Sequence, residues 1–223
     1  MKKLAKKMLR DIEEDVKYTR YMTGRSHLSN ETITALSEVP RDAFVPEQLK
    51  ESAFVNGPLP IGHGQTISQP YIVALMTDLL DIKPDHIILE IGTGSGYQSA
   101  ILSLLCQQVY SMELIPDLSN SAKQRFKKLN YNNIEAFTGN GYSGYPEHAP
   151  YDGIIVTAAA THIPEALVTQ LKPGGHLVIP VGLSHMHQEL ILLEKDSNDK
   201  TNVNHILDVS FVPLIDAPVK SQP

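Results

Sequence analysis

The sequence has a single cysteine and no tryptophan among its 223 residues. Cys106 cannot form an internal disulfide, and its place in the apolar run that begins at Ile101 favours a buried hydrophobic side chain over a nucleophile. No apolar stretch approaches the ~20 residues that a membrane span requires, and no long apolar segment follows the lysines near the N-terminus. We therefore expect neither a membrane protein nor a secreted one, and take the cytoplasm as the default location.

Positive charge is also scarce, with 19 Lys and Arg against 25 Asp and Glu and a net charge of −6. Nucleic-acid binders usually carry a basic surface, so nucleic acid is not an expected partner. The nine histidines are scattered, and His185 and His187 form only a close pair in a predicted loop. A lone pair of this kind is weak evidence for a ligand set, so we expect no metal.

The first 84 residues predict helices joined by loops. Helices are expected over 1–21, over 31–39 with Ser29 or Asn30 as its cap, in a short stretch after Pro46, and from a Ser68 cap to Leu80, with a Gly- and Pro-rich loop over 57–64. From residue 86, strand and helix patterns alternate. Strands are predicted over 86–91, 108–113, 133–138, 151–157, 176–181, 189–194 and 206–211, and helices over 95–105, 116–129 and 164–171.

Alternating strands and helices predict an α/β protein with a doubly wound, mostly parallel sheet of seven strands and helices on both faces. Hydrophobic residues make up 42% of the chain, which is ordinary for a protein with a buried core. The length predicts one domain with a small extension. We therefore divide the chain into an N-terminal helical segment over 1–84, packed on the main domain, and an α/β core over 85–223.

A glycine-rich run, Leu89-Glu90-Ile91-Gly92-Thr93-Gly94-Ser95-Gly96, lies between a predicted strand and a predicted helix. Glycines there allow a tight turn and a close approach of the backbone to a ligand at the carboxyl edge of the sheet. A dinucleotide fold is the main competitor. The dinucleotide fold has the spacing Gly-x-Gly-x-x-Gly, whereas this run has Gly-x-Gly-x-Gly. Such a fold also usually begins near the N-terminus of the chain, whereas about 85 residues precede this run.

Glu113 ends the next predicted strand, 21 positions after Gly92. A carboxylate there can accept hydrogen bonds from both hydroxyls of a ribose. The plainer interpretation is an exposed acid at a strand end, and the glycine run upstream favours the ribose role.

Three further segments, together with the glycine run and Glu113, indicate one particular protein family. They are Pro58–Pro70 (PLPIGHGQTISQP), Ala149–Ala159 (APYDGIIVTAA) and Leu171–Gly182 (LKPGGHLVIPVG). With the glycine run and Glu113, they make the chain similar to the protein-L-isoaspartate O-methyltransferases from about Val39 to Leu214. The first segment discriminates, because generic methyltransferases lack it.

The resemblance implies that S-adenosyl-L-methionine is the cofactor and that isoaspartyl proteins and peptides are the substrates. Methylation of the isoaspartyl carboxylate would begin repair to aspartate, through a succinimide. Ser68 stands at the catalytic position, in what would be an active-site loop of the N-terminal segment. The cofactor would be bound by Thr66, Ile67, Ser68, Gly92, Thr93, Gly94, Glu113, Asn140 and Gly141. The substrate backbone would be bound by Val212, Pro213 and Leu214.

Two other functions remain open at this point. One is a methyltransferase that acts on another nucleophile, which the segment around Ser68 disfavours. The other is a protein that binds S-adenosylmethionine without catalysis, which two departures from the family pattern keep open. Asn140 stands where the family usually has aspartate, and Ser210 where relatives often carry arginine. If Asn140 meets the adenine amino group, Asn140→Asp should tighten cofactor binding by ~1 kcal/mol, because a charge-assisted bond is stronger.

Overall fold

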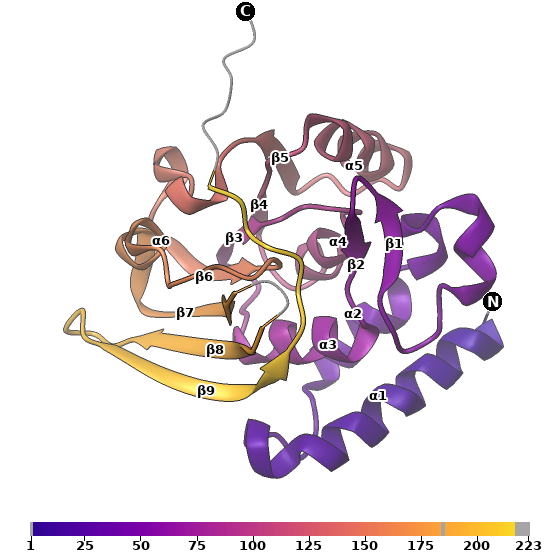
Figure 1. Ribbon diagram of the computed structural model, residues 1–223, viewed down its shortest axis with the longest axis horizontal. Helices are drawn as coiled ribbons and strands as arrows, with labels where there is room; N and C mark the ends of the chain where they lie inside the picture. The colour runs from indigo at the N-terminus through magenta and orange to yellow at the C-terminus, as the bar shows by residue number, and fades with distance from the viewer. Residues whose placement is uncertain (1, 184–185, 217–223) are drawn as a thin grey trace, which may run out of the picture.

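The computed structural model describes residues 2–183 and 186–216, which fold around a seven-stranded sheet (Figure 1). The strand order is β5-β4-β3-β6-β7-β8-β9. Neighbours from β5 to β7 run parallel, whereas the β7–β8 and β8–β9 pairs are antiparallel. This confirms the mostly parallel sheet. The strands are β3 (Ile87–Ile91), β4 (Gln108–Glu113), β5 (Ile134–Thr138), β6 (Tyr151–Val156), β7 (Leu171–Gly182), β8 (Gln188–Lys195) and β9 (Thr201–Val209).

Helices and short 3₁₀ turns connect these strands and form the N-terminal part of the chain. The α-helices are α1 (Lys2–Thr23), α2 (Asn30–Glu38), α3 (Pro70–Leu79), α4 (Tyr97–Ser103), α5 (Pro116–Lys128) and α6 (Glu165–Gln170). The 3₁₀ turns are η1 (Arg41–Phe44), η2 (Glu47–Ser52), η3 (Gly141–Ser143) and η4 (Pro146–His148). A separate hairpin pairs β1 (Leu59–Gly62) with β2 (Gln65–Ile67). None of the described helices is both long and apolar enough to cross a membrane.

The two faces of the sheet are covered by different numbers of helices. On one face, strand residues such as Ile88, Val109 and Ile155 share a core with buried side chains of α1 to α5. On the other face, Leu89 and Ile154 pack with the short helix α6 and the segments around η3 and η4. Alternate residues of a strand point to opposite faces, so the continuous apolar strands bury both sides. Helices therefore lie on both faces, as predicted, and the N-terminal helices share the larger core.

The stretch over 57–64 was expected to be a loop, but the structure places most of the β1–β2 hairpin there. Its turn residues Gly62, His63 and Gly64 all have positive φ. Glycine-rich sequence is typical of tight hairpin turns as well as of loops, and the two strands are only four and three residues long. The sequence pattern was too short to separate the two possibilities.

Ser68 was expected to cap α3, and that prediction is wrong. The N-cap is Gln69, no side chain caps the helix, and Pro70 is the first helical residue. Since a proline at that position has no N–H to satisfy, the helix needs less capping. The Ser68 side chain is thus not used as a helix cap.

Two strand predictions also need correction. β9 runs over Thr201–Val209 instead of 206–211, and its first half is polar and exposed, so no apolar pattern marks it. β7 runs over Leu171–Gly182 instead of 176–181, and its early start comes with an irregular register against β6.

Candidate active site

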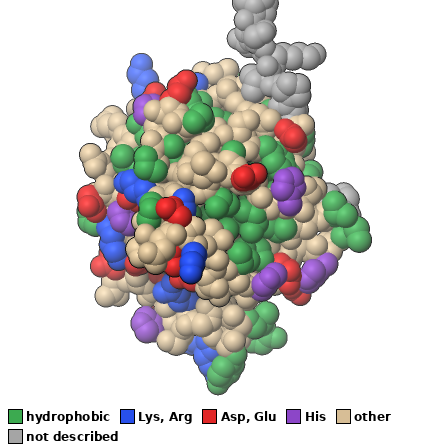
Figure 2. All heavy atoms as spheres, turned by 90° about the vertical axis from the view of Figure 1, so that its left-hand side faces the viewer, with side chains coloured by type: hydrophobic (Ala, Val, Ile, Leu, Met, Phe, Trp, Pro, Cys, Tyr) green, Lys and Arg blue, Asp and Glu red, His purple; other side chains and the backbone are tan. Residues whose placement is uncertain are grey.

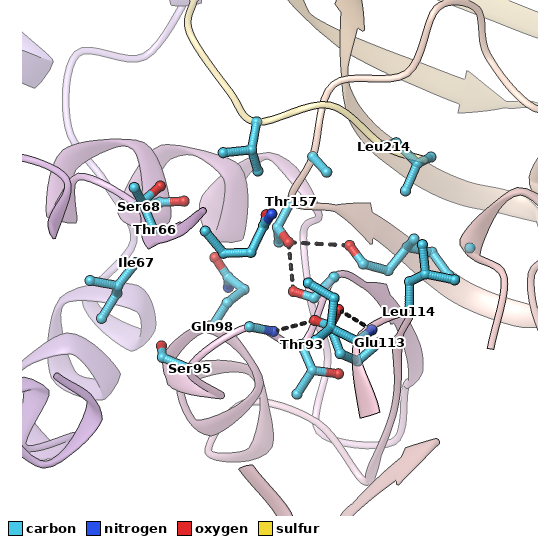
Figure 3. Close-up of a pocket in the computed structure, with 18 of the residues that line it drawn as sticks. Thr66, Ile67, Ser68, Thr93, Ser95, Gln98, Glu113, Leu114, Thr157 and Leu214 are labelled. Carbon is cyan, nitrogen blue, oxygen red and sulfur yellow. Dashed lines mark hydrogen bonds between the residues drawn. The ribbon is translucent and has the colours of Figure 1, made fainter. Parts of the chain in front are cut away.

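A cavity lies at the carboxyl ends of β3, β4 and β6. This is where ligands bind in open α/β sheets. Figure 3 shows Thr66 and Ser68 on one side of the cavity, Thr93 and Glu113 on the other, and Thr157 between them. We define two sides of the cavity. The sheet wall consists of Gly92, Thr93, Gly94, Glu113 and Thr157, and the loop wall consists of Thr66, Ile67, Ser68, Val212, Pro213 and Leu214.

The glycine loop of the sheet wall takes a path that side chains would obstruct. Gly92 has a φ of +99°, and a Cβ atom there would lie 2.3 Å from the Thr157 hydroxyl oxygen. That hydroxyl donates a 2.6 Å hydrogen bond to the Gly92 carbonyl. The loop is also bound to β4, where the Gly92 N–H donates to the Met112 carbonyl at 2.7 Å. Thr157 was missed at the sequence level, although its place at the end of β6 was a usable signal.

Glu113 is buried, so the alternative of an exposed strand-end acid is wrong. Its carboxylate accepts the N–H of Gly94 at 2.8 Å through Oε2 and the N–H of Ile115 at 3.0 Å through Oε1. A carboxylate has roughly four acceptor positions, so acceptor capacity remains on the side of the cavity. Glu113 therefore fixes the glycine loop and offers an acceptor to a ligand at the same time.

A second buried acid, Glu90, lies beneath the glycine loop. Its Oε2 accepts hydrogen bonds from the hydroxyls of Ser99 and Ser111, and the Ser111 hydroxyl is 2.6 Å from that of Thr93 in the loop. Within the described residues, its Oε1 has no hydrogen-bond partner. Burial, the largest cause, raises the pKa of Glu90 to about 7. Sequence reasoning missed this network, although a charged residue inside an apolar strand was visible.

The loop wall is anchored by a buried arginine. Arg41 of η1 is fully buried, and its guanidinium donates to the Ser68 carbonyl at 2.7 Å and to the Ala53 carbonyl at 2.8 Å. It also lies 4.7 Å from the centre of the Tyr97 ring. Burial lowers the pKa of Arg41. Burying a cation is unfavourable unless its donors are used. Here Nε and Nη2 are used and fix the backbone of Ala53 and Ser68, whereas Nη1 has no hydrogen-bond partner among the described residues. Nothing in the sequence marked Arg41 as buried.

The C-terminal part of the loop wall is tied to the chain after β6. The Ala159 N–H donates to the Val212 carbonyl, and the Leu214 N–H donates to the Ala159 carbonyl, both at 2.8 Å. These bonds hold 212–214 at the cavity, whose lining includes these residues that the resemblance assigns to the substrate. A second cavity shares Ser68 and other residues with the first and is also lined by Ser210.

Among the candidate site residues, Asn140 is the one that does not line the cavity, whereas its neighbour Gly141 does. The Asn140 side chain caps η3 by accepting the Tyr142 N–H at 3.1 Å. Its Nδ2 donates to Asp216 at 2.8 Å.

The family to which known relatives of this chain belong agrees with the geometry of the cavity. Residues 18–218 match the family model for protein-L-isoaspartate(D-aspartate) O-methyltransferase. The chain belongs to this family. It is 52% identical over 208 residues to protein-L-isoaspartate O-methyltransferase 2 of Syntrophobacter fumaroxidans, covering 93% of this chain and 84% of the relative. It is 51% identical to the protein of that name from Polaromonas, covering 93% and 98%.

Solved structures of the methyltransferase family share the fold. One protein-L-isoaspartate O-methyltransferase superimposes with a TM-score of 0.80 at 27% identity, over 94% of this chain and 65% of that chain. A putative family member from Plasmodium falciparum, in complex with S-adenosyl-L-homocysteine, gives a TM-score of 0.75 at 25% identity, over 93% and 98%. The resemblance inferred from four short segments and Glu113 thus extends over most of the chain.

Proposed function

We propose that this methyltransferase transfers the methyl group of S-adenosyl-L-methionine to the free carboxylate of L-isoaspartyl residues in damaged proteins and peptides. Membership of the family supports the reaction. The observation that carries the assignment of the site is that Ser68 and Glu113, from segments far apart in the sequence, line one cavity. The methyl ester that forms would lose its alcohol to give a succinimide, which opens in part to aspartate.

The cavity fits the cofactor by the chemistry of its donors and acceptors. Glu113 retains acceptor positions for the two ribose hydroxyls, and the glycine backbone lets the methionine part approach Gly92, Thr93 and Gly94 closely. Gly141 and its neighbour Asn140 would bound the adenine, while Thr66, Ile67 and Ser68 face the reacting end. When bound, the cofactor supplies an electrophilic methyl group on a positively charged sulfur.

The protein's part of the reaction is orientation. A substrate carboxylate, with an ordinary pKa of about 3.9, is already ionised at pH 7, so attack needs no general base. We propose that the Ser68 hydroxyl donates to one carboxylate oxygen and directs the other at the methyl group. Holding reactants in line can supply ~7–11 kcal/mol, and excluding water favours a step that neutralises opposite charges.

The backbone of the peptide substrate would lie against Val212, Pro213 and Leu214. These residues line the same cavity as Ser68, and Val212 also lines the second cavity together with Ser210. A peptide could therefore run through the second cavity and present its carboxylate in the first.

The decisive experiment measures methyl transfer to an isoaspartyl peptide and to its aspartyl twin of otherwise identical sequence. We expect the isoaspartyl peptide to be methylated far faster. Equal rates would contradict the substrate assignment, and cofactor binding without transfer to either peptide would support a binding protein instead. RNA in the same assay serves as the unrelated acceptor.

We also predict that the protein has no nucleic-acid or membrane partner, that no metal takes part in the reaction, that the protein is cytoplasmic, and that the chain divides at residue 84.

A further inference from the structure

A cluster of metal-ligating side chains lies on the β8–β9 hairpin, apart from the residues assigned to methyl transfer. His187, Glu189 and Asp208 each offer one atom, and these three atoms lie within 4.8 Å of one another. Figure 2 shows histidine and acidic side chains gathered at the right-hand edge of that view. We propose that this cluster is a binding site for a divalent transition-metal ion of the zinc type.

The cluster is assembled by strand register. Glu189 of β8 lies directly opposite Asp208 of β9, and His187, the residue just before β8, places its Nε2 atom near both carboxylates. Two carboxylates in directly opposed positions of a sheet repel each other. A cation seated between them would offset that repulsion, and His187 completes the set with a neutral nitrogen.

The distances suit a small tetrahedral ion. The Nε2 atom of His187 is 3.5 Å from Oε1 of Glu189 and 3.7 Å from Oδ1 of Asp208. Zinc bonds of about 2.0–2.2 Å at tetrahedral angles require ligand atoms roughly 3.3 Å apart. Side-chain rotations that close the remaining separations, all of which are within 4.8 Å, would bring the three atoms to bonding positions, with water as the fourth ligand. A mixed imidazole and carboxylate set favours zinc, copper or nickel over magnesium or calcium.

A β-bulge adds an outer partner to the cluster. Leu190 pairs with Leu207 but Ile191 pairs with His205, so Ile206 is the extra residue. His205 and Asp208, three positions apart, would face opposite sides of a regular strand. With the bulge, His205 Nδ1 lies 3.0 Å from Oε2 of Glu189, to which it can donate. Metal-binding carboxylates are commonly held by such outer hydrogen bonds.

The site also borders the region proposed to receive the substrate, because Asp208 lines the second cavity together with Ser68 and Ser210. Sequence reasoning expected no metal, because His187 was seen only beside His185. The register and the bulge that bring the other side chains to His187 were not visible in the sequence.

The test is a calorimetric titration of the full chain, without a histidine tag and stripped of metal, with ZnCl₂ and separately with MgCl₂. We expect saturable binding of one zinc ion per chain and no measurable binding of magnesium. Absence of saturable zinc binding would overturn the proposal. The readout does not depend on methyl transfer, so it stands or falls apart from the proposed function.

Variants locate the ion. His187→Ala and Asp208→Asn should each weaken zinc binding at least tenfold, and His205→Ala should weaken it by roughly tenfold, as expected for an outer partner. His27→Ala, which removes an exposed histidine elsewhere, is the matched control and should bind as the unmodified chain does. All these side chains are exposed, so the variants should fold. If His187→Ala and Asp208→Asn bind zinc unchanged, the residues form only a surface ion-pair cluster.

Discussion

The two walls of the cavity are held in place by different kinds of interaction. The sheet wall stands on adjacent parallel strands. Gly94 and Glu113, which are joined by a hydrogen bond, are 19 positions apart, and Thr157 reaches Gly92 from 65 positions away because β6 pairs with β3. The loop wall is held by segments that lie outside the parallel strands. Arg41 of η1 donates to the Ser68 carbonyl, and Ala159 bonds to the chain on both sides of Pro213. The position of the sheet wall thus follows from strand pairing, whereas that of the loop wall depends on contacts between irregular segments.

Removal of Glu113 should give the largest effect, because one carboxylate serves both the sheet wall and the ligand. Glu113→Ala removes two proposed bonds to the cofactor, at ~1.5–3 kcal/mol each for a charged acceptor. We expect calorimetry to show cofactor affinity reduced at least 100-fold. Glu113→Gln, which keeps the size but not the charge, should fall in between. Unchanged affinity in Glu113→Ala would refute the ribose role.

On the loop wall, Arg41→Met should reduce turnover only by releasing the backbone of Ser68 from its position. The carbonyls of Ser68 and Ala53 lose their donors, at ~1–3 kcal/mol for each buried group left unsatisfied. We expect a loss of roughly 2–6 kcal/mol in the free energy of unfolding by the same reasoning. The folded fraction should show reduced turnover with cofactor affinity retained. Arg41→Lys restores one donor and should recover part of both. If turnover of folded Arg41→Met is normal, the arginine supports the fold and not the position of Ser68.

Glu90, beneath the glycine loop of the sheet wall, should make the stability of the protein depend on pH. Its pKa in the folded protein is about 7, above the ordinary 4.5, because burial disfavours the charged form. The folded state therefore binds the proton more tightly than the unfolded state. This contribution to stability is fully present below pH 4.5, declines as pH rises towards 7, and is lost above it. Its total size is on the order of 3 kcal/mol.

Glu90→Gln stays neutral and should remove that pH dependence. We expect the variant to be more stable than the unmodified chain at pH 8 and nearly equal to it below pH 5, measured by denaturant unfolding at each pH. A stability difference that stays constant between pH 5 and 8 would show that Glu90 is not protonated in this range.

Ser68→Ala should have a smaller effect, confined to the reacting end of the loop wall. Loss of one hydrogen bond to a carboxylate costs ~1.5–3 kcal/mol, or about 10- to 150-fold in turnover. Fold stability should barely change, because Ser68 does not cap α3. Ser68→Thr keeps the hydroxyl and should retain more activity. Normal turnover at saturating cofactor, with cofactor affinity lost, would make Ser68 a cofactor contact only.

The contrast between the walls also explains what the sequence could predict. The glycine run, Glu113 and most strand boundaries follow from local periodicity and turn chemistry, and β4 was predicted to the residue. The loop wall was assigned only through family resemblance, because no local pattern brings Ser68 and Pro213 together. Arg41, Thr157 and the Glu90 network were missed, since burial of a polar side chain depends on partners distant in the chain.

Asn140 belongs to neither wall, although its neighbour Gly141 lines the cavity, and here the structure alters the expectation drawn from the sequence. The side chain caps η3 and donates to Asp216, so Asn140→Asp would keep the cap, lose the donor and place two carboxylates together. That repulsion opposes the ~1 kcal/mol gain expected from a charged acceptor. We therefore expect cofactor affinity in the single variant to stay within about threefold of the original, under 1 kcal/mol. Asp216→Asn added to Asn140→Asp restores a donor opposite the new carboxylate. If position 140 meets the adenine amino group, this double variant should bind the cofactor tighter by ~1 kcal/mol than Asp216→Asn alone. Equal affinities would leave Asn140 as a cap of η3 and give the adenine contact to Gly141 and its surroundings.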